Sequence, residues 1–210
     1  MPQLTSHTRR WVSIVLPMVL LCTLIMIGVH FQWWDISWQQ QRIRDGEFWR
    51  LWSGHWQHLS WSHWLMNQLG LMLIVWVSPK LLENYRWLIA FVVISPIIGL
   101  GLMGSELYGY VGLSGVLYGL LLYGCLVDRS IPLYMKALVF CVVVGRVVIE
   151  QNWPEFNSLT EEQIGGFVAI DGHLFGTIGG LLLVLAELSF RKIRSYRKIR
   201  PQPEQSSEAP

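Results

Sequence analysis

The sequence predicts an all-α membrane protein with six transmembrane helices, and three observations support this fold class. Hydrophobic residues make up 52% of the 210 residues and charged residues only 14%, against about 25% charged residues in a soluble domain. The apolar residues form long runs, and Trp11 to Phe31 contains no Asp, Glu, Lys or Arg. The basic residues concentrate in alternate connections between these runs. Because about 20 apolar residues cross a bilayer core of about 30 Å, a soluble single-domain protein is all but excluded.

Apolar runs between charged or turn-forming breaks define the six spans in chain order. They are expected at about residues 11–31, 61–77, 87–104, 110–127, 132–149 and 166–188. The first run follows Arg9 and Arg10 like an export signal, but it is long and lacks a small-residue cleavage site, so we expect a retained helix. Residues 1–10 are expected to form a cytoplasmic N-terminus and residues 11–190 one six-span domain. A basic and then disordered cytoplasmic tail is expected at 191–210.

The distribution of Lys and Arg predicts the orientation of the chain. Both termini and one set of connections carry twelve basic residues: Arg9, Arg10, Lys80, Arg86, Arg129, Lys136, Arg191, Lys192, Arg194, Arg197, Lys198 and Arg200. The other set carries three: Arg42, Arg44 and Arg50. Both termini are therefore expected in the cytoplasm, which favours an even number of spans. The extracytoplasmic stretch 32–60 holds half of the 12 tryptophans, and we expect it to lie in the outer membrane interface.

Composition and spacing give no indication of nucleic-acid, disulfide or metal chemistry. A net charge of +2 is too small to suggest nucleic-acid binding. The three cysteines lie within apolar runs without C-x-x-C spacing and are expected to be packing residues. His55, His58 and His63 lack an H-E-x-x-H pattern and a carboxylate at ligand-like spacing, so we interpret them as interface histidines among tryptophans. No metal or cofactor is expected.

Three polar residues are predicted to share one depth in the membrane. At about 1.5 Å per residue, Asn67, Ser114 and His173 lie about 18, 21 and 25 Å from the cytoplasmic ends of their spans. These are the second, fourth and sixth spans, which run in the same direction. In a core of about 30 Å, all three residues occupy the half nearer the extracytoplasmic side. Since polar side chains are costly in lipid, their common level indicates a functional site.

Small residues predict that the fourth and sixth spans pack against each other. Glycines recur along one side of each span: Gly112, Gly115 and Gly119 in the fourth, and Gly172, Gly176 and Gly180 in the sixth. Such stripes allow two helix backbones to approach closely. Ser114 and His173 each adjoin a stripe glycine, so facing stripes would bring the two side chains within reach.

A serine beside a histidine is the minimal activated nucleophile, because imidazole titrates near pH 6.5 and accepts the hydroxyl proton. His63 and Asn67 are spaced i and i+4 on one helical face and could donate to an oxyanion, alongside the Ser114 backbone N–H. Asp171 precedes His173 by two positions and points to another side of the helix, so we predict a Ser-His dyad. This set favours acyl transfer, and proteolysis above all.

Four motifs at these positions resemble the rhomboid family of intramembrane serine proteases. They are Phe48-Trp49-Arg50 before the second span, His63-x-x-x-Asn67 within it, Gly112-Leu113-Ser114-Gly115 opening the fourth, and Gly172-His173-x-x-Gly176 in the sixth. G-x-S-G alone is a weak signal, whereas four motifs in order are specific. The resemblance covers about residues 11–188 and implies a six-helix rhomboid-like bundle. It implies Ser114 as nucleophile, His173 as general base and acid, and His63 and Asn67 as oxyanion partners.

The resemblance also implies that Tyr118 packs on the imidazole of His173. A narrower similarity is to the rhombosortases, a branch associated with exported bacterial proteins that end in a Gly-Gly, helix and basic-tail sorting signal. The similar stretches are Trp49–His55, Tyr110–Leu117 and Glu150-Gln151. At position 118 that branch has histidine, whereas Tyr118 is typical of general rhomboids. The similarity implies membrane-anchored substrates and an active site that opens to the periplasmic side of the bacterial inner membrane.

Two charged residues and two other function classes provide alternatives to this interpretation. Arg146 and Glu150 are spaced i and i+4 near the outer end of the fifth span, and with Trp49 and Arg50 they are expected to be structural. A non-catalytic rhomboid-like protein that escorts membrane clients typically lacks the serine or histidine, and both are present. A transporter needs polar residues through both leaflets, whereas these cluster in one. The favoured function is intramembrane endoproteolysis of Gly-Gly anchors, with a general rhomboid protease as the alternative.

Overall fold

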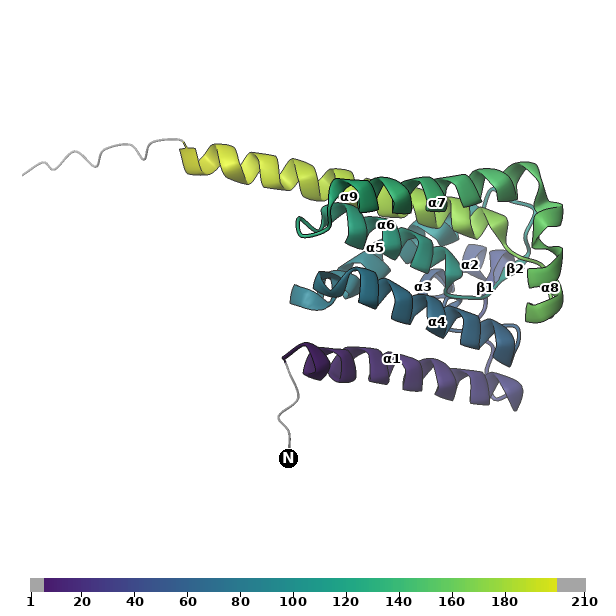
Figure 1. Ribbon diagram of the computed structural model, residues 1–210. Coiled ribbons are helices and arrows are strands. Elements are labelled where there is room, and N and C mark those ends of the chain that lie inside the picture. The colour runs from purple at the N-terminus through teal and green to yellow at the C-terminus, as the bar shows by residue number, and fades with distance from the viewer. Residues whose placement is uncertain (1–5, 200–210) are drawn as a thin grey trace, which may run out of the picture.

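The computed structural model describes residues 6–199, and this part of the chain is mostly helical. Its longer helices are α1 (Ser6–His30), α4 (Trp61–Val77), α5 (Arg86–Leu102), α6 (Ser114–Val127), α7 (Leu133–Asn152) and α9 (Ile170–Ile199) (Figure 1). The connections contain α2 (Gln40–Arg44), α3 (Arg50–Ser53), α8 (Ser158–Ile164) and the 3₁₀ helices η1 (Pro79–Tyr85) and η2 (Pro154–Asn157). The predicted disordered end of the tail lies outside the described residues.

A long helix lies at each of the six ranges predicted from the apolar runs. Within the described residues, α9 is the one helix both long and apolar enough to cross a membrane, over Ile170–Tyr196. Val15–His30 of α1, α5 and α6 are shorter apolar helices. The largest differences in boundary are at α9, which continues through the basic tail to Ile199, and at α1, which begins at Ser6 instead of about 11. Helix α6 begins at Ser114 instead of about 110. The helical fold class is confirmed, and the number of spans stays a prediction.

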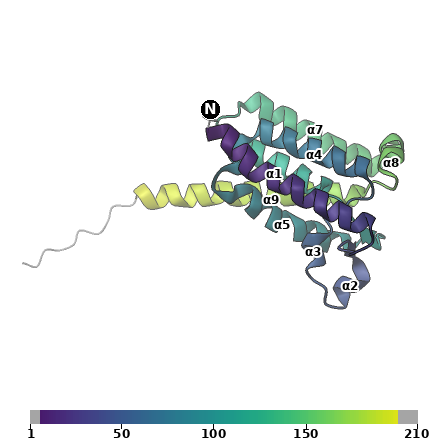
Figure 2. The ribbon, with the colours of Figure 1, turned by 90° about the horizontal axis from the view of Figure 1, so that it is seen from below.

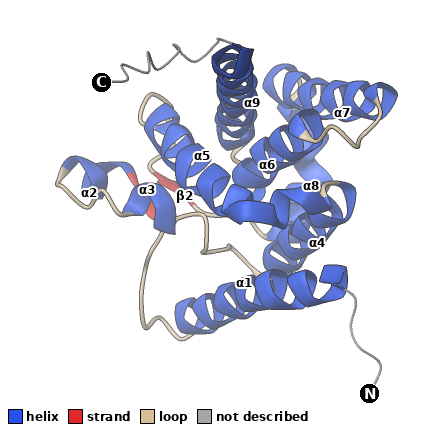
Figure 3. Cartoon of the chain, turned by 90° about the vertical axis from the view of Figure 1, so that its left-hand side faces the viewer, coloured by secondary structure: helices blue, strands red, loops and turns tan. Residues whose placement is uncertain are grey.

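Helix α6 lies at the centre of the bundle, where α4, α5, α7 and α9 pack around it (Figure 3). Its most extensive contact is with α9. Helix α1 packs on α4 at the edge of the bundle (Figures 1 and 3). The start of α1 and the end of α9 lie at one end of the bundle, and α8 lies at the other (Figure 1). This arrangement agrees with a chain whose two termini share one side of a membrane.

Glycines set the close approach of α6 and α9. A Cβ atom built at Gly115, Gly119 or Gly180 would lie 2.5 Å from a carbonyl oxygen of the opposite helix. At Gly176 it would lie even closer, against the carbonyl of Gly115. Since real Cβ atoms do not approach oxygen so closely, each of these positions excludes any side chain at the present helix separation.

Of the other two predicted stripe glycines, Gly172 contacts Gly115 through its carbonyl group and also contacts β2, whereas Gly112 contacts α4. Gly112 precedes α6 with φ of +122°, and a Cβ there would lie 2.7 Å from Cε1 of His63 on α4. Gly172 faces the ring of Tyr110 at 3.1 Å. The prediction that Gly112 packs against the sixth span is wrong, because the chain is not yet helical at this position and helical periodicity does not apply to it.

Gly176→Ala is expected to force α6 and α9 apart and to destabilise the protein. Overpacking of this kind costs about 1–3 kcal/mol, and each kcal/mol lowers the unfolding temperature of a chain of this size by about 2–4 °C. Gly145→Ala on α7 is the matched control, because a Cβ there meets nothing within 4 Å. Thermal unfolding in detergent measures both variants. An unfolding temperature unchanged in Gly176→Ala would contradict the backbone contact.

The stretch between α1 and α4 forms a folded layer beside α5 (Figure 2). Strand β1 (Trp38–Gln39) pairs antiparallel with β2 (Gly109–Tyr110), so the described fold is not purely helical. Arg50 is buried; its Nε donates to Glu47 at 2.6 Å and its Nη1 to the Ser37 carbonyl at 2.6 Å. The guanidinium also lies 4.4 Å from the ring centroid of Trp49. The Arg50 contacts hold the layer together, and the β1–β2 pair joins it to the segment that precedes α6.

Trp38 is a core residue, and its predicted place in the membrane interface is wrong. Its ring is only 1% exposed, and Nε1 donates to the carbonyl of Gly99 in α5 at 3.1 Å. Trp33, Trp34 and Trp49 are exposed, as interface residues are expected to be. The tryptophans of this stretch therefore lie both in the core and on the surface.

Candidate active site

Ser114 is the first residue of α6 and follows a sharp turn after β2. The φ of +122° at Gly112 is a conformation that glycine adopts without steric strain. The Tyr110 hydroxyl donates to the Gly112 carbonyl at 2.7 Å, and the Gly112 N–H donates to the Gly54 carbonyl at 3.1 Å. The turn is thus tied to the folded layer. It presents Ser114 at a helix N-terminus, where unpaired N–H groups favour negative charge.

His173 lies in the first turn of α9 and faces Ser114 across the close helix contact. Its Nε2 is 2.9 Å from Ser114 Oγ. The Tyr118 ring stacks on the imidazole with 4.4 Å between centroids and 5° between planes. The neighbouring residues Gly115 and Gly172 are in backbone contact, which explains how a short serine side chain reaches the other helix. The structure therefore brings together Ser114 and His173, the two residues of the predicted dyad, and places Tyr118 on the imidazole as the resemblance implies.

A carboxylate from α7 contacts the imidazole of His173 on the side away from Ser114. Oε2 of Glu150 lies 2.7 Å from Nδ1 of His173, and Glu150 is only 1% exposed. Its Oε1 accepts from Arg146 Nε at 2.9 Å and from the Tyr118 hydroxyl at 3.5 Å. The predicted ion pair of Arg146 with Glu150 is present, and the contact with histidine comes in addition. Spacing within one helix does not predict a contact between α7 and α9.

His63 and Asn67 of α4 supply hydrogen-bond donors beside Ser114. The N–H of Leu59 donates to His63 Nδ1 at 3.4 Å, so the neutral ring carries its proton on Nε2. Nε2 would lie 2.9 Å from a Cβ at Gly112, directly beside the turn that leads to Ser114. Asn67 Nδ2 is buried without a hydrogen-bond partner among the described residues. Both donors thus remain free for a group that enters the site.

The reacting centre opens into a cavity of about 410 Å³. Met66, Gly70 and Leu73 of α4 line one wall, and Val142 and Val143 of α7 line the other. Most of the lining is apolar, and the polar side chains gather at the end that holds Ser114. Its size and apolar lining are within the usual range for cavities that bind a ligand.

A family model described as the Rhomboid domain matches residues 45–190, a range that includes every residue of the site above. The chain belongs to the rhomboid family. No curated protein matches it. This match confirms the resemblance to the family. Rhomboids are integral membrane proteins, and they are generally intramembrane serine proteases that act on membrane protein substrates.

The other predicted residues of this rhomboid lie away from the reacting centre. Trp49 and Arg50 belong to the folded layer at the bundle end. Gly119, Gly176 and Gly180 continue the α6–α9 contact toward the opposite end. These residues hold the elements that carry the site and do not line the cavity.

Two histidines of the rhomboid domain are buried, contrary to the prediction of interface residues. His55 lies against Phe91 and Tyr110, and the ring of His58 meets that of His63 edge-on, with 5.1 Å between centroids. Burial lowers the pKa of His55 to about 4, and burial and the nearby His63 lower that of His58 to about 3. Both rings are therefore neutral at pH 7. In the described part of the chain, no three His, Cys, Asp or Glu side chains are grouped to hold a metal ion.

Proposed function

We propose that this rhomboid is an active intramembrane serine endopeptidase, with Ser114 as nucleophile and His173 as general base and acid. The hydrogen bond between Ser114 Oγ and His173 Nε2 carries this proposal. It lies beside two free donors, at the polar end of a cavity large enough for a peptide. A non-catalytic client-binding protein would not require this combination of groups.

The reaction follows the usual two steps of serine hydrolases. Ser114 Oγ attacks the scissile carbonyl while His173 Nε2 takes the hydroxyl proton. The negative charge on the carbonyl oxygen is stabilised by His63 Nε2–H, Asn67 Nδ2–H and the backbone N–H of Ser114. His173 then gives its proton to the leaving amine, and an acyl-enzyme forms. Water loses a proton to His173, attacks the ester and releases the carboxylic acid and free Ser114.

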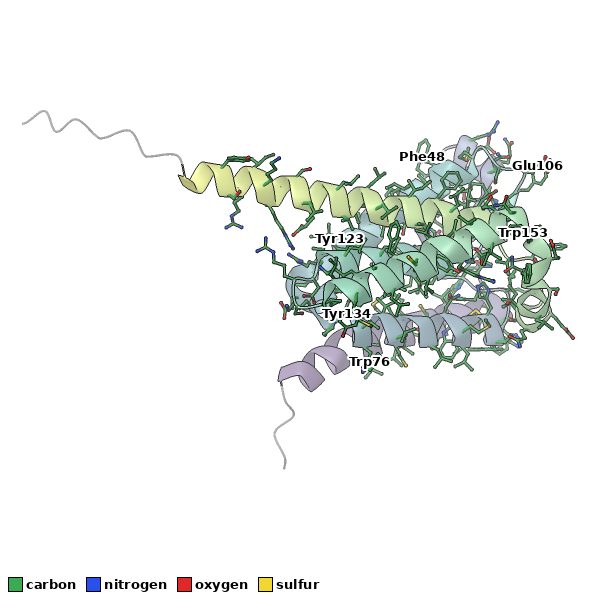
Figure 4. The ribbon with its side chains drawn as sticks, turned by 45° about the horizontal axis from the view of Figure 1, so that its top comes forward. Phe48, Trp76, Glu106, Tyr123, Tyr134 and Trp153 are labelled. Carbon is green, nitrogen blue, oxygen red and sulfur yellow. The ribbon has the colours of Figure 1, made fainter. Side chains whose placement is uncertain are left out.

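The proposed placement in the membrane has six spans, both termini in the cytoplasm and the active site near the periplasmic face of the bacterial inner membrane. Ser114, His173 and His63 each lie in the first turn of a helix, at the bundle end opposite to the end of α9. Trp76 and Tyr134, which are 74% and 72% exposed, lie toward one end, and Trp153 lies toward the other (Figure 4). Exposed aromatic residues at two levels are typical of the two membrane interfaces.

The proposed substrates are membrane-anchored segments of exported proteins. A helical peptide hides its carbonyl groups in its own hydrogen bonds, so a substrate must be extended to reach Ser114. Gly-Gly favours this unwinding, which supports C-terminal Gly-Gly sorting anchors as the substrate class, together with the similarity of Trp49–His55 and Tyr110–Leu117 to rhombosortases. Co-expression with a tagged Gly-Gly anchor and with its Leu-Leu variant tests this. Equal cleavage of both would favour a general rhomboid protease.

Fluorophosphonate labelling tests the nucleophile itself. The purified protein in detergent is expected to take up one label, which peptide mapping locates on Ser114, because the neighbouring base activates only this hydroxyl. Ser114→Ala is expected to remove the label. Ser105→Ala is the control, because the Ser105 hydroxyl donates to the Leu102 carbonyl at 2.9 Å, outside the cavity lining. A label that persists in Ser114→Ala, or attaches to Cys or Lys, contradicts the proposal.

A further inference from the structure

We infer that Glu150 is a positioning residue for His173, so that the reacting centre has three members, Ser114, His173 and Glu150. This inference rests on the proposed function and extends it to α7. The carboxylate does not touch the scissile bond and acts only through the imidazole. Three observations support it: the geometry at Nδ1, the pairing of both carboxylate oxygens, and the lack of another acid at the ring among the described residues.

The first observation is the geometry at Nδ1. A distance of 2.7 Å between Glu150 Oε2 and His173 Nδ1 is that of a charge-assisted hydrogen bond. The acceptor fixes the neutral imidazole in the tautomer with its proton on Nδ1, which leaves the lone pair of Nε2 directed at the Ser114 hydroxyl at 2.9 Å. Without a partner at Nδ1, the ring could also carry its proton on Nε2, the tautomer that cannot accept from serine.

The second observation is that the structure satisfies the buried carboxylate completely. Burying an ionised group is costly unless it is paired and hydrogen-bonded. Oε1 of Glu150 faces Arg146 Nε at 2.9 Å, and Arg146 Nη2 in turn donates to Asn157 in η2. Asn157 is fully buried and so holds the guanidinium in place. An ion pair with Arg146 alone would not need Oε2 to face the histidine.

The third observation concerns the groups that surround the imidazole. From α7 it is faced by Glu150 and, behind it, Arg146; from α6 by the Tyr118 ring; and from α4 by His63. On α9 itself, Asp171 accepts a hydrogen bond from α7 at 3.5 Å and makes no contact with the ring among the described residues. Glu150 is therefore the carboxylate that stabilises the imidazolium formed when Ser114 loses its proton.

The test is Glu150→Gln, which keeps the side-chain shape and removes the charge. We expect kcat to fall by about 10²- to 10⁴-fold with KM changed less than threefold, as when the carboxylate behind a catalytic histidine is neutralised. Fluorophosphonate labelling of Ser114 is expected to slow in parallel. Because the imidazolium loses its counter-charge, the acidic limb of the kcat/KM profile is expected to move to lower pH. Gln151→Ala, at the adjacent exposed position, is the control and is expected to keep wild-type rates.

Glu150→Gln leaves Arg146 beside an uncharged partner and could prevent folding. A second variant keeps the inference testable in that case. Arg146→Gln with Glu150→Gln removes both charges together, and double removal of a buried pair is tolerated better than removal of one partner. This double variant is expected to be folded and to show the same loss of kcat and the same displaced acidic limb. Arg146→Gln alone keeps the carboxylate on His173, so its folded fraction is expected to lose less than 10-fold in kcat.

The outcomes separate this inference from the proposed function. Labelling of Ser114 in the wild type, together with slow labelling and the displaced limb in the charge-free variants, supports a positioning role for Glu150. The positioning role is overturned if Glu150→Gln or the double variant folds, keeps kcat within threefold of wild type and has an unchanged pH profile. Ser114 and His173 would then act as a dyad. If the wild type takes up no label at Ser114, the proposed function fails and this inference fails with it.

Discussion

Ser114→Ala is expected to abolish cleavage of a membrane-anchored substrate, with a loss of about 10⁴-fold or more in kcat. Loss of the serine oxygen removes the covalent step, and only binding and the oxyanion donors remain. His173→Ala is expected to cause a similar loss, since the hydroxyl then has no base. The measurement is cleavage of a tagged substrate in cells, with protein levels followed by immunoblot.

A double variant, with both Ser114 and His173 replaced by alanine, gives a more specific test. In a serine hydrolase the nucleophile and base act as a unit, so Ser114→Ala with His173→Ala is expected to be no slower than either single variant. Ser105→Ala, outside the cavity lining, is the control and is expected to cleave at the wild-type rate. Continued cleavage in either single variant, at normal protein level, would refute the assigned chemistry.

Loss of the oxyanion donors is expected to have the next largest effect. Removal of one such donor costs about 10²- to 10³-fold in kcat, because the bond forms only as charge develops on the carbonyl oxygen. We therefore expect losses of this size in His63→Ala and in Asn67→Ala, with KM nearly unchanged. The measurement is the steady-state rate on a purified substrate in detergent.

A neighbouring residue provides the matched control for these two donors. Gln68 is also buried on α4 but does not line the cavity, so Gln68→Leu is expected to keep kcat within about threefold of wild type. A normal kcat in both His63→Ala and Asn67→Ala would show that the donors serve packing alone. A rise in KM without a fall in kcat would place them in substrate binding instead.

The positions of the long helices could be predicted because each is an apolar run with chemical breaks. The break between α6 and α7, for example, falls at Asp128, the C-cap of α6, and Pro132, the N-cap of α7. The short elements could not be predicted. The strands at Trp38–Gln39 and Gly109–Tyr110 are two residues long and depend on pairing between distant parts of the chain. The predicted start of α6 is too early, because apolar content alone does not indicate the turn at Gly112.

Most of the site could be predicted because its residues lie on parallel helices, where depth follows from counting. Ser114, His173 and Asn67 were placed together in this way. Glu150 was assigned to its own helix partner, Arg146, because spacing relates residues within a helix and gives no rotation of α7 about its axis. A signal is nonetheless present in the sequence: Glu150 is an acid at the outer end of an apolar span, near the depth of His173, and a charge at this position requires compensating partners.

The contact of backbone oxygens with glycines between α6 and α9 also bears on how the protein tolerates different lipids. Bilayers vary in thickness by a few Å, and helices adjust to them by tilting. Helices separated by flexible side chains can tilt independently, whereas two backbones in direct contact along Gly115, Gly119, Gly176 and Gly180 tilt as one unit. Helices such as α1, which packs on α4 at the edge of the bundle, can change their tilt to match the bilayer thickness. We therefore expect the distance from Ser114 to His173 to stay the same in bilayers of different thickness.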